Sequence, residues 1–170
     1  MTEEYVILVD ESDRSVGTME KMAAHQQGLL HRAISVFVLD SDGRLLLQQR
    51  AAHKYHSAGL WTNTCCSHPA PGETAADAAH RRLRQEMGME VPLEFAFTFK
   101  YRAGFDNGLV EHEVDHVFIG YTSHAPVINP EEVADYRWLS LPEIERELAN
   151  NPDAYTPWFK IIYRKIFARI

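Results

Sequence analysis

The residues most suited to chemistry are two adjacent cysteines, Cys65 and Cys66, followed two positions after the second by His68. A nearby cation or imidazolium lowers the pKa of a thiol and activates it, so Cys66 is a candidate reactive group. Free cysteines are more commonly buried and inert, and the pattern alone leaves both interpretations open. A Cys–His protease would also need an orienting third group and an oxyanion hole, and neither stands at a recognisable spacing.

Histidines and glutamates form a second candidate site. Of the nine histidines, His25, His31 and His68 stand in or beside predicted loops, while Glu111 and Glu113 share one face of a predicted strand. Three imidazoles and two carboxylates would suit zinc, manganese, iron or cobalt better than calcium. Each residue taken alone is more simply explained as an exposed loop or strand residue, because the spacing is not that of a zinc finger.

Cationic and aromatic side chains flank these segments. The cations are Lys21, Arg50, Lys54, Arg81 and Arg82. On a chain of net charge −7 such a cluster would mark one anion-binding pocket, since local charge can override the total. Scattered surface charge explains any single member more simply. Three aromatic residues would either line an apolar pocket or pack in the core: Trp61, Tyr101 and Trp158.

The composition restricts the class of protein. An excess of 24 acidic over 17 basic residues argues against nucleic-acid binding, which needs a basic patch. No stretch approaches the roughly 20 apolar residues of a membrane span, and we expect no secretory signal. Two adjacent cysteines make a poor disulfide framework, so a cytoplasmic location is expected. The length predicts a single domain over residues 1–170.

The elements that must position these groups are strands and a few helices. Runs of β-branched and aromatic residues predict strands over 5–9, 33–39, 44–50, 93–101, 109–121 and 133–139, the second and third forming a hairpin. Capping patterns predict helices over 74–87, from 140 and from 156. The segment 21–28 is expected to be a loop. Together these elements predict an α+β fold, with helices packed on a mixed or mostly antiparallel sheet.

Alternation along the predicted strands indicates which side chains face the same way. In the strand over 93–101, four aromatic side chains are expected to point inward: Phe95, Phe97, Phe99 and Tyr101. In the strand over 109–121, both glutamates of the candidate metal site share a face. An extended backbone at the cysteines would turn Cys65 away from Cys66.

Several motifs, taken in chain order, resemble one known family. They are Lys21-x-Ala23-Ala24-His25, His31 entering a strand, Trp61-Thr62-Asn63-x-x-Cys66-x-His68-Pro69, Gly72-Glu73, Arg81-Arg82-x-Arg84-x-Glu86-x-Gly88, Tyr101-Arg102-Ala103, Glu111-His112-Glu113-Val114 and Thr156-Pro157-Trp158. This set resembles the type I isopentenyl diphosphate isomerases, the metal-dependent and flavin-free type, over essentially the whole chain. The resemblance implies a Nudix-like α/β/α sandwich.

The chain departs from the wider Nudix pattern G-x5-E-x7-R-E-U-x-E-E-x-G. With the last glycine set on Gly88, the first glycine falls on Ser67, and three positions match: Glu73, Arg81 and Glu86. Two acidic positions instead carry Arg82 and Gln85. A Nudix hydrolase needs those carboxylates for its metals, so their replacement argues against diphosphate hydrolysis and agrees with an isomerase.

The resemblance implies reversible movement of a double bond between isopentenyl and dimethylallyl diphosphate, a reaction of isoprenoid biosynthesis. The alkene is protonated to a tertiary carbocation, which then loses a proton from the neighbouring methylene. Two proton-handling groups must therefore flank the substrate. By resemblance, Glu113 with Tyr101 supplies one proton and Cys66 takes the other, with the roles exchanged in the reverse direction.

The resemblance also implies two divalent metals and no flavin. An ion of the manganese or zinc type would be bound by His25, His31, His68, Glu111 and Glu113. A magnesium ion would hold the diphosphate through Glu86, together with Lys21, Arg50, Lys54 and Arg82. The aromatic face of Trp158 would stabilise the carbocation. We expect a small diphosphate substrate, no nucleic-acid or membrane partner, and a monomer or weak homodimer.

Two other classes of protein stay open. A Nudix-type diphosphohydrolase would release phosphate from a nucleoside diphosphate derivative. A metal- or thiol-responsive binding module would bind metal and leave isopentenyl diphosphate unchanged. The joint presence of Cys66, Tyr101 and Glu113 favours an enzyme, since a binding module needs no such set.

Overall fold

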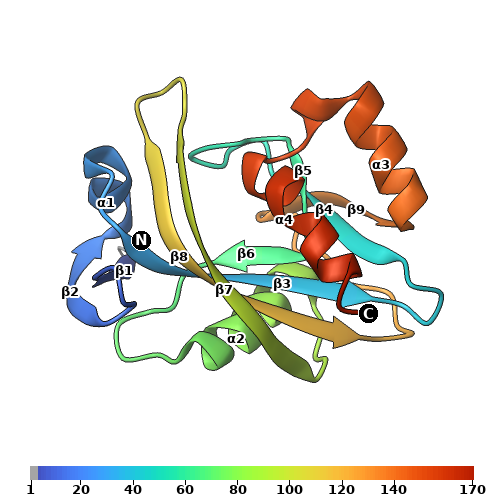
Figure 1. Ribbon diagram of the computed structural model, residues 1–170, viewed down its shortest axis with the longest axis horizontal. Coiled ribbons are helices and arrows are strands. Elements are labelled where there is room, and N and C mark those ends of the chain that lie inside the picture. The colour runs from blue at the N-terminus through green and yellow to red at the C-terminus, as the bar shows by residue number, and fades with distance from the viewer. Residues whose placement is uncertain (1–3) are drawn as a thin grey trace.

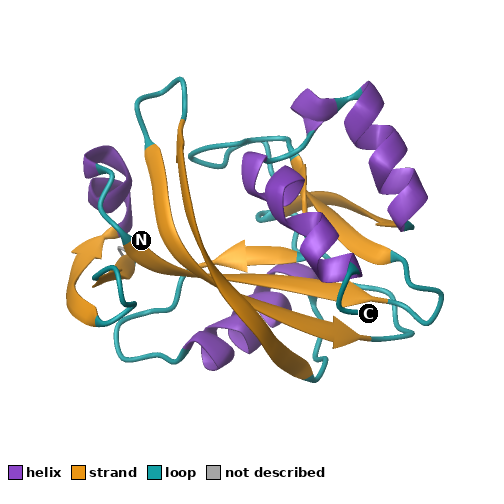
Figure 2. Ribbon diagram, viewed as in Figure 1, coloured by secondary structure: helices purple, strands orange, loops and turns teal. Residues whose placement is uncertain are grey.

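The computed structural model describes residues 4–170, and in that range nine strands form one mixed sheet with helices on both faces (Figures 1 and 2). The strands are β1 (Tyr5–Val9), β2 (Ser15–Glu20), β3 (His31–Leu39), β4 (Leu45–Arg50), β5 (Trp61–Thr62), β6 (Cys65–Ser67), β7 (Leu93–Gly104), β8 (Val110–Tyr121) and β9 (Val133–Leu139). The helices are α1 (Lys21–Gln27), α2 (Ala75–Met87), α3 (Leu141–Asn150) and α4 (Pro157–Phe167), with a 3-10 turn at Pro152–Ala154.

The centre of the sheet is a parallel pair, β3 and β8. Their register runs from His31 opposite Glu113 to Leu39 opposite Tyr121. The long strand β7 is antiparallel to β8, and the short strand β6 is antiparallel to β3. The prediction that β3 and β4 pair as a hairpin is therefore wrong, except next to the turn that joins them. The two strands meet only at Leu39 and Leu45, because β8 and β6 pair along β3, while β4 pairs with β9 and β5.

Each face of the sheet carries its own core, which gives the expected α/β/α layers. On one face α2 contributes Ala79, Leu83 and Met87, which pack with alternate residues of β3 and with Phe118. On the other face α3 and α4 pack with Phe37 and the remaining core positions of β3, β4 and β8. Figure 1 shows α2 and α4 on opposite sides of β3. All three of these α2 side chains are fully buried.

The segment 21–28 is a helix and not the predicted loop. The carboxylate of Glu20 accepts hydrogen bonds from the backbone N–H groups of Met22 and Ala23, which caps α1 at its start. Gly28, at φ 66°, ends the helix in the left-handed conformation. Aspartate and serine are common N-cap residues, whereas glutamate is not, so the sequence does not mark the start of this helix. The helix buries His25 completely.

The aromatic alternation predicted for β7 holds only in part. A bulge at Ala96 shifts the register, so that Phe95 lies opposite Phe118 while Phe97 lies opposite Val117. An extra residue in one strand moves the following side chains to the other face. Phe95 is consequently 57% exposed, whereas Phe97 and Phe99 pack against the core under α4.

Two further expectations concern helix starts and membrane spans. Ser140 and Glu143 form the predicted capping box of α3. Thr156 precedes Pro157 as predicted, but its hydroxyl bonds to Thr62 Oγ1 at 2.8 Å and does not cap the helix. Within residues 4–170, none of the helices has both the length and the apolar character needed to cross a bilayer.

Gly88 ends α2 at φ 61°, and a Cβ atom there would collide with the backbone oxygen of Val127. Gly88→Ala should therefore lower the free energy of unfolding by roughly 2 kcal/mol or more, from left-handed strain plus the collision. Urea denaturation measures the loss. Gly108→Ala is the matched control, because Gly108 has φ 83° with open space around it. Equal losses at both positions would contradict the role assigned to the collision.

Candidate active site

One face of the sheet gathers the acidic side chains of β8. Glu111, Glu113 and Asp115 alternate along the strand and all point to the same side. The neighbouring strands place His31 of β3 and Tyr101 of β7 directly opposite Glu113. The predicted shared face of the two glutamates is therefore confirmed, and the sheet register brings an imidazole and a phenol to the same point.

Five residues form a compact group of nitrogen and oxygen atoms that could hold a metal ion. One ligand atom of each lies within 4.8 Å of all the others: His25, His31, His68, Glu111 and Glu113. Helix α1 supplies the first histidine, β3 the second and the segment after β6 the third, while β8 supplies both carboxylates. The structure thus brings together the complete set expected for the manganese- or zinc-type ion.

Backbone carbonyls fix the orientation of two of these imidazoles. His25 Nδ1 lies 2.7 Å from the oxygen of Lys21, and His31 Nδ1 lies 2.8 Å from the oxygen of Leu29. When Nδ1–H donates to a carbonyl, the lone pair of a neutral ring is on Nε2. In both rings Nε2 is buried and makes no hydrogen bond. Glu111 Oε2 is also buried without a hydrogen-bond partner, so the donor set fits a divalent cation.

The electrostatics of His31 and His68 match this chemistry, whereas burial would lower the pKa of His25 but its contact with Glu111 raises it. Burial lowers the pKa of His31 to about 4 and that of His68 well below its usual value, so both are neutral at neutral pH, as metal ligands must be. Burial and the adjacent charge of Glu111 raise the pKa of Glu113 well above its usual value. Burial would also raise the pKa of Glu111, but the close side chains of Glu113, His25 and His56 outweigh burial and lower it. The pair therefore retains a proton in the absence of a cation.

Cys66 faces the same side of the sheet, and Cys65 faces the opposite core. The register pairs Cys66 with Ser35 and Cys65 with Val36. Cys65 is fully buried on the α2 side, whereas the Cys66 thiol donates to Asn63 Oδ1 at 3.0 Å. The expected opposite orientation of the two thiols is thus confirmed.

The surroundings of Cys66 do not lower the pKa of its thiol, as a nearby cation or imidazolium would. Burial, followed by the charge of Asp115, raises the pKa of Cys66 to about 12. His68 Nε2 lies 2.8 Å from Glu113 Oε2, in the metal group. Trp158 Nε1–H donates to Cys66 Sγ at 3.2 Å. Cys66 is therefore a protonated thiol at neutral pH in the protein without metal.

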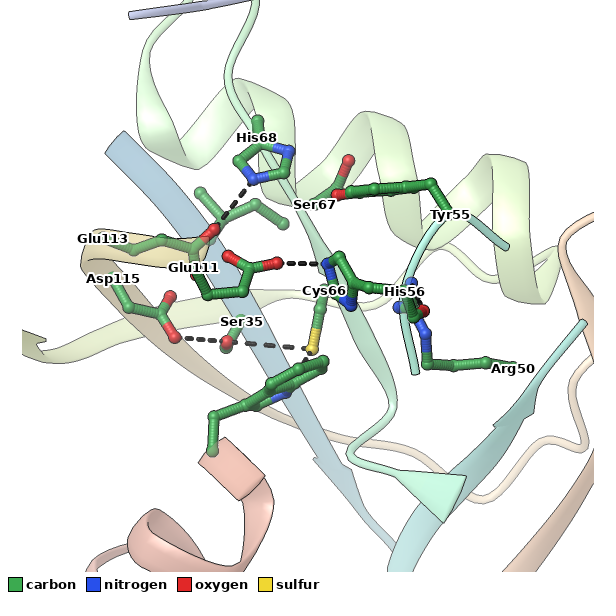
Figure 3. Close-up of a pocket in the computed structure, with 12 residues that line it drawn as sticks. Ser35, Arg50, Tyr55, His56, Cys66, Ser67, His68, Glu111, Glu113 and Asp115 are labelled. Carbon is green, nitrogen blue, oxygen red and sulfur yellow. Dashed lines mark hydrogen bonds and ion pairs between the residues drawn. The ribbon is translucent and has the colours of Figure 1, made fainter. Parts of the chain in front are cut away.

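A cavity of about 30 Å³ separates Cys66 from the carboxylates (Figure 3). The walls include Ser35, Cys66, Glu111, Glu113, Asp115 and Trp158. Tyr101 lies beside this cavity, with its ring centroid 6.2 Å from that of Trp158 and its hydroxyl buried without a hydrogen-bond partner. Burial raises the pKa of Tyr101, so its proton stays on the oxygen. Trp61 does not line the cavity and instead stacks on Arg137, 4.2 Å from the guanidinium carbon.

A groove of about 300 Å³ adjoins the cavity and shares Cys66, His68 and Arg50 with it. All four predicted diphosphate-binding cations line this groove: Lys21, Arg50, Lys54 and Arg82. Arg81 does not join them and forms a two-pronged pair with Glu73 at 2.7 and 2.8 Å. The cavity, which carries the thiol and the carboxylates, and the groove, which carries the four cations, therefore lie side by side.

The sequence model of the NUDIX domain family matches residues 29–159. Isopentenyl-diphosphate Delta-isomerase 2 from Aromatoleum aromaticum is 58% identical over 156 residues, which are 92% of this chain and 82% of that protein. The isopentenyl-diphosphate Delta-isomerase of Pectobacterium atrosepticum is 53% identical over 161 residues, covering 95% and 90%. This chain belongs to the isopentenyl-diphosphate Delta-isomerase family of Nudix proteins.

Solved structures agree on the fold of this isomerase. A crystal structure of a Deinococcus radiodurans protein superposes with a TM-score of 0.79 at 21% identity, covering 95% of this chain and 98% of that one. The MutT protein of Methanosarcina mazei gives a TM-score of 0.65 at 18% identity, covering 82% and 94%. The Nudix-like α+β sandwich expected for the chain is confirmed.

Glu86 lies apart from the five-residue metal group of the isomerase. Its Oε2 accepts from Arg82 at 2.9 Å and from the Cys65 thiol at 3.5 Å, while Oε1 accepts from Gln48 at 2.9 Å. Both carboxylate oxygens are therefore engaged inside the protein. Its role as a magnesium ligand stays a prediction, and binding an ion there would require at least one of these bonds to be exchanged.

Several carboxylates that no sequence pattern marks pair with the expected diphosphate cations of the isomerase. Lys21 bonds to Glu4 at 2.8 Å, and Lys54 pairs closely with Glu132. Arg82 lies 3.2 Å from the same Glu132. These acids stand in loops or at the chain start with no periodicity to mark them.

Three polar residues around the thiol were also given no role. Asn63 directs its carbonyl oxygen at Cys66 because both of its N–H bonds are used by the backbone oxygens of Val36 and Cys65. Ser35 Oγ donates to Asp115 Oδ2 at 2.6 Å. The only sequence signal was the alternation that places Asp115 on the face of the two glutamates.

The raised pKa of Cys66 predicts how the thiol reacts in metal-free protein. Only the thiolate is alkylated, so the iodoacetamide rate should rise roughly tenfold per pH unit from about pH 7 to about pH 10 without levelling off. Mass spectrometry of the Cys65→Ala variant would follow Cys66 alone. Asp115→Asn removes a charge that raises this pKa and should speed alkylation at each pH above about 7. A plateau at about pH 8.5, as in a free cysteine, would contradict the raised pKa.

Proposed function

We propose that this chain isomerises isopentenyl diphosphate to dimethylallyl diphosphate, reversibly and through a tertiary carbocation, as a step of isoprenoid biosynthesis. The names of its close relatives support this activity. The observation that carries the proposal is a single cavity with the Cys66 thiol on one side and Glu113 on the other. Addition of a proton at one carbon and removal at another, on opposite faces, needs such a pair.

Cys66 and Glu113 are the proton-handling pair in this proposal, and Tyr101 assists Glu113. The raised pKa values of Cys66 and Glu113 leave both groups protonated in the protein without metal. Turnover requires one member to hold a proton while the other accepts one, and the roles exchange with direction. A divalent cation held by the five-residue group would supply positive charge and lower the pKa of Glu113. With that charge in place, Cys66 and Glu113 would hold one proton between them.

The rest of the cavity protects the carbocation. The indole of Trp158 lines the cavity and can stabilise a desolvated cation by about 2 kcal/mol. The cavity volume of about 30 Å³ is close to that of one water molecule, so the isopentenyl group enters only by moving side chains and displacing water. Exclusion of water prevents capture of the carbocation as an alcohol.

The groove beside the cavity is assigned to the diphosphate. Lys21, Arg50, Lys54 and Arg82 would supply charge-assisted hydrogen bonds, and Glu86 would hold a magnesium ion with the diphosphate. We assign a manganese- or zinc-type ion to the five-residue group from its mixture of imidazole and carboxylate ligands. The free thiols of Cys65 and Cys66 support a reducing, cytoplasmic location.

Hydrolysis of a nucleoside diphosphate is not favoured. The two acidic Nudix positions that carry Arg82 and Gln85 lie next to each other, and Arg82 donates to Gln85 Oε1 at 2.8 Å. A guanidinium and an amide cannot replace the carboxylates that bind magnesium in a hydrolase.

Cys66→Ala should lower kcat by about 10²–10⁴-fold, because a proton-transfer group is lost. Cys65→Ala, on the opposite face of β6, should keep most of the activity. Proton NMR in deuterated water, with metal-loaded protein and isopentenyl diphosphate, should show deuterium entering the allylic methylene and the methyl carbons. Normal turnover by the Cys66 variant would refute the catalytic assignment, and absence of exchange in the unmutated protein would refute the isomerase proposal.

Glu132 competes with the diphosphate for Lys54 and Arg82. Glu132→Gln should lower the KM for isopentenyl diphosphate about fivefold with little change in kcat, corresponding to about 1 kcal/mol. Steady-state kinetics at saturating metal would measure both constants. Glu131→Gln, at an exposed neighbour in the same groove, is the control and should leave KM unchanged. A higher KM for Glu132→Gln would mean that the carboxylate orients the cations and does not compete.

A further inference from the structure

His56 lies against the metal group without being one of its five members. It belongs to the loop between β4 and β5, and only 5% of the residue is exposed. Its Nε2 contacts Glu111 Oε1 directly, as the dashed line in Figure 3 shows. Both ring nitrogens of His56 are buried, and neither makes a regular hydrogen bond within the described residues. A buried imidazole aimed at a metal-group carboxylate needs an explanation beyond loop packing.

Aromatic packing fixes the ring of His56 independently of any metal. Phe105, at the tip of the β7–β8 hairpin, stacks on it with centroids 4.8 Å apart and planes 8° apart. Trp158 meets it edge-on at 5.8 Å, and Tyr55 at 4.3 Å. Because aromatic rings pack against several sides of His56, its Nε2 has a defined position, as an orienting hydrogen-bond donor requires.

The backbone of the same loop is anchored on both sides. Arg50 donates from its guanidinium to the carbonyl oxygen of His56 at 3.2 Å. Asn107, from the β7–β8 hairpin, donates from its side-chain amide to the carbonyl oxygen of Tyr55 at 3.0 Å. His56 is therefore held by contacts that reach from the diphosphate groove to the hairpin tip.

We propose that His56 is a positioning residue for the metal site, whose Nε2–H donates to Glu111 Oε1 and so holds the carboxylate in the orientation that binds a divalent cation. Glu111 Oε2, which is buried and has no hydrogen-bond partner, is left for the ion. A carboxylate with one oxygen bonded to an imidazole N–H loses less rotational freedom when the metal binds. The proposal rests on the five-residue metal group and not on the isomerase reaction, so the two can fail separately.

The dissociation constant for Mn²⁺ tests the proposal directly. Competition with a chromophoric chelator would compare the unmutated protein with His56→Phe, which keeps an aromatic ring between Phe105 and Trp158 but removes the N–H group. The affinity should fall about 10–100-fold, as it does when outer-sphere partners of metal ligands are removed. His53→Phe, at an exposed histidine of the same loop, is the control and should bind as the unmutated protein does. An unchanged dissociation constant for His56→Phe overturns the proposal.

A second pair of measurements separates positioning from ligation and from misfolding. X-ray absorption of the cobalt-loaded proteins should give the same number of imidazole ligands in His56→Phe as in the unmutated protein, and the loss of one overturns the proposal in favour of direct ligation. His56→Gln retains an N–H donor and should recover at least part of the lost affinity. Should His56→Phe fail to fold, as judged by circular dichroism of the metal-free protein, His56→Asn and His56→Gln replace it. If His56→Asn and His56→Gln lose the same affinity for Mn²⁺, the proposed orienting hydrogen bond is overturned.

Discussion

Two carboxylates buried side by side set the main constraint on this structure. Glu111 and Glu113 lie on the same face of a central strand and are largely removed from water. Two like charges at this depth cannot both persist without compensating positive charge. The protein surrounds them with three histidines whose available nitrogens face inward, an arrangement that could hold a cation. Burial together with the adjacent charge of Glu111 raises the pKa of Glu113.

The same constraint explains why the site lies on a sheet and not on loops. The register of β3, β7 and β8 places His31, Tyr101 and Glu113 side by side through backbone hydrogen bonds. Short β6 adds Cys66 to the same face while sending Cys65 into the opposite core. Each of these positions depends on the two-residue period of a strand, so a slip by one residue would replace the reactive side chain with a core residue.

The sequence predicted the parts of the site that depend on local periodicity. The shared face of Glu111 and Glu113 and the opposed thiols followed from alternation alone. The resemblance of the motifs supplied the ligand set, because no local pattern could show that His25, 86 residues before Glu111 in the chain numbering, would contact it. The helix α1 was missed because a glutamate caps it, and the outward turn of Phe95 was missed because a bulge leaves no mark on hydrophobic spacing.

The contacts that no pattern predicted are those made by loops across the sheet. His56 meets Glu111 and Lys54 meets Glu132 only after the whole domain has folded. Such contacts depend on the tertiary path of connecting segments, which single-sequence reasoning constrains weakly. The first contact joins the metal group to the loop beside the groove, and the second lies within the groove.

The parallel pairing of β3 and β8 has a consequence for biosynthesis. Parallel neighbours require a long crossover, and here the crossover runs from β4 to β7 and includes α2, so the two central strands are far apart in the chain. A nascent chain leaving the ribosome exposes His25 and His31 well before Glu111 and Glu113 have been translated. Until β8 emerges, the early histidines lack the carboxylates that complete the site. The five candidate metal ligands can therefore come together only after β8 has been translated.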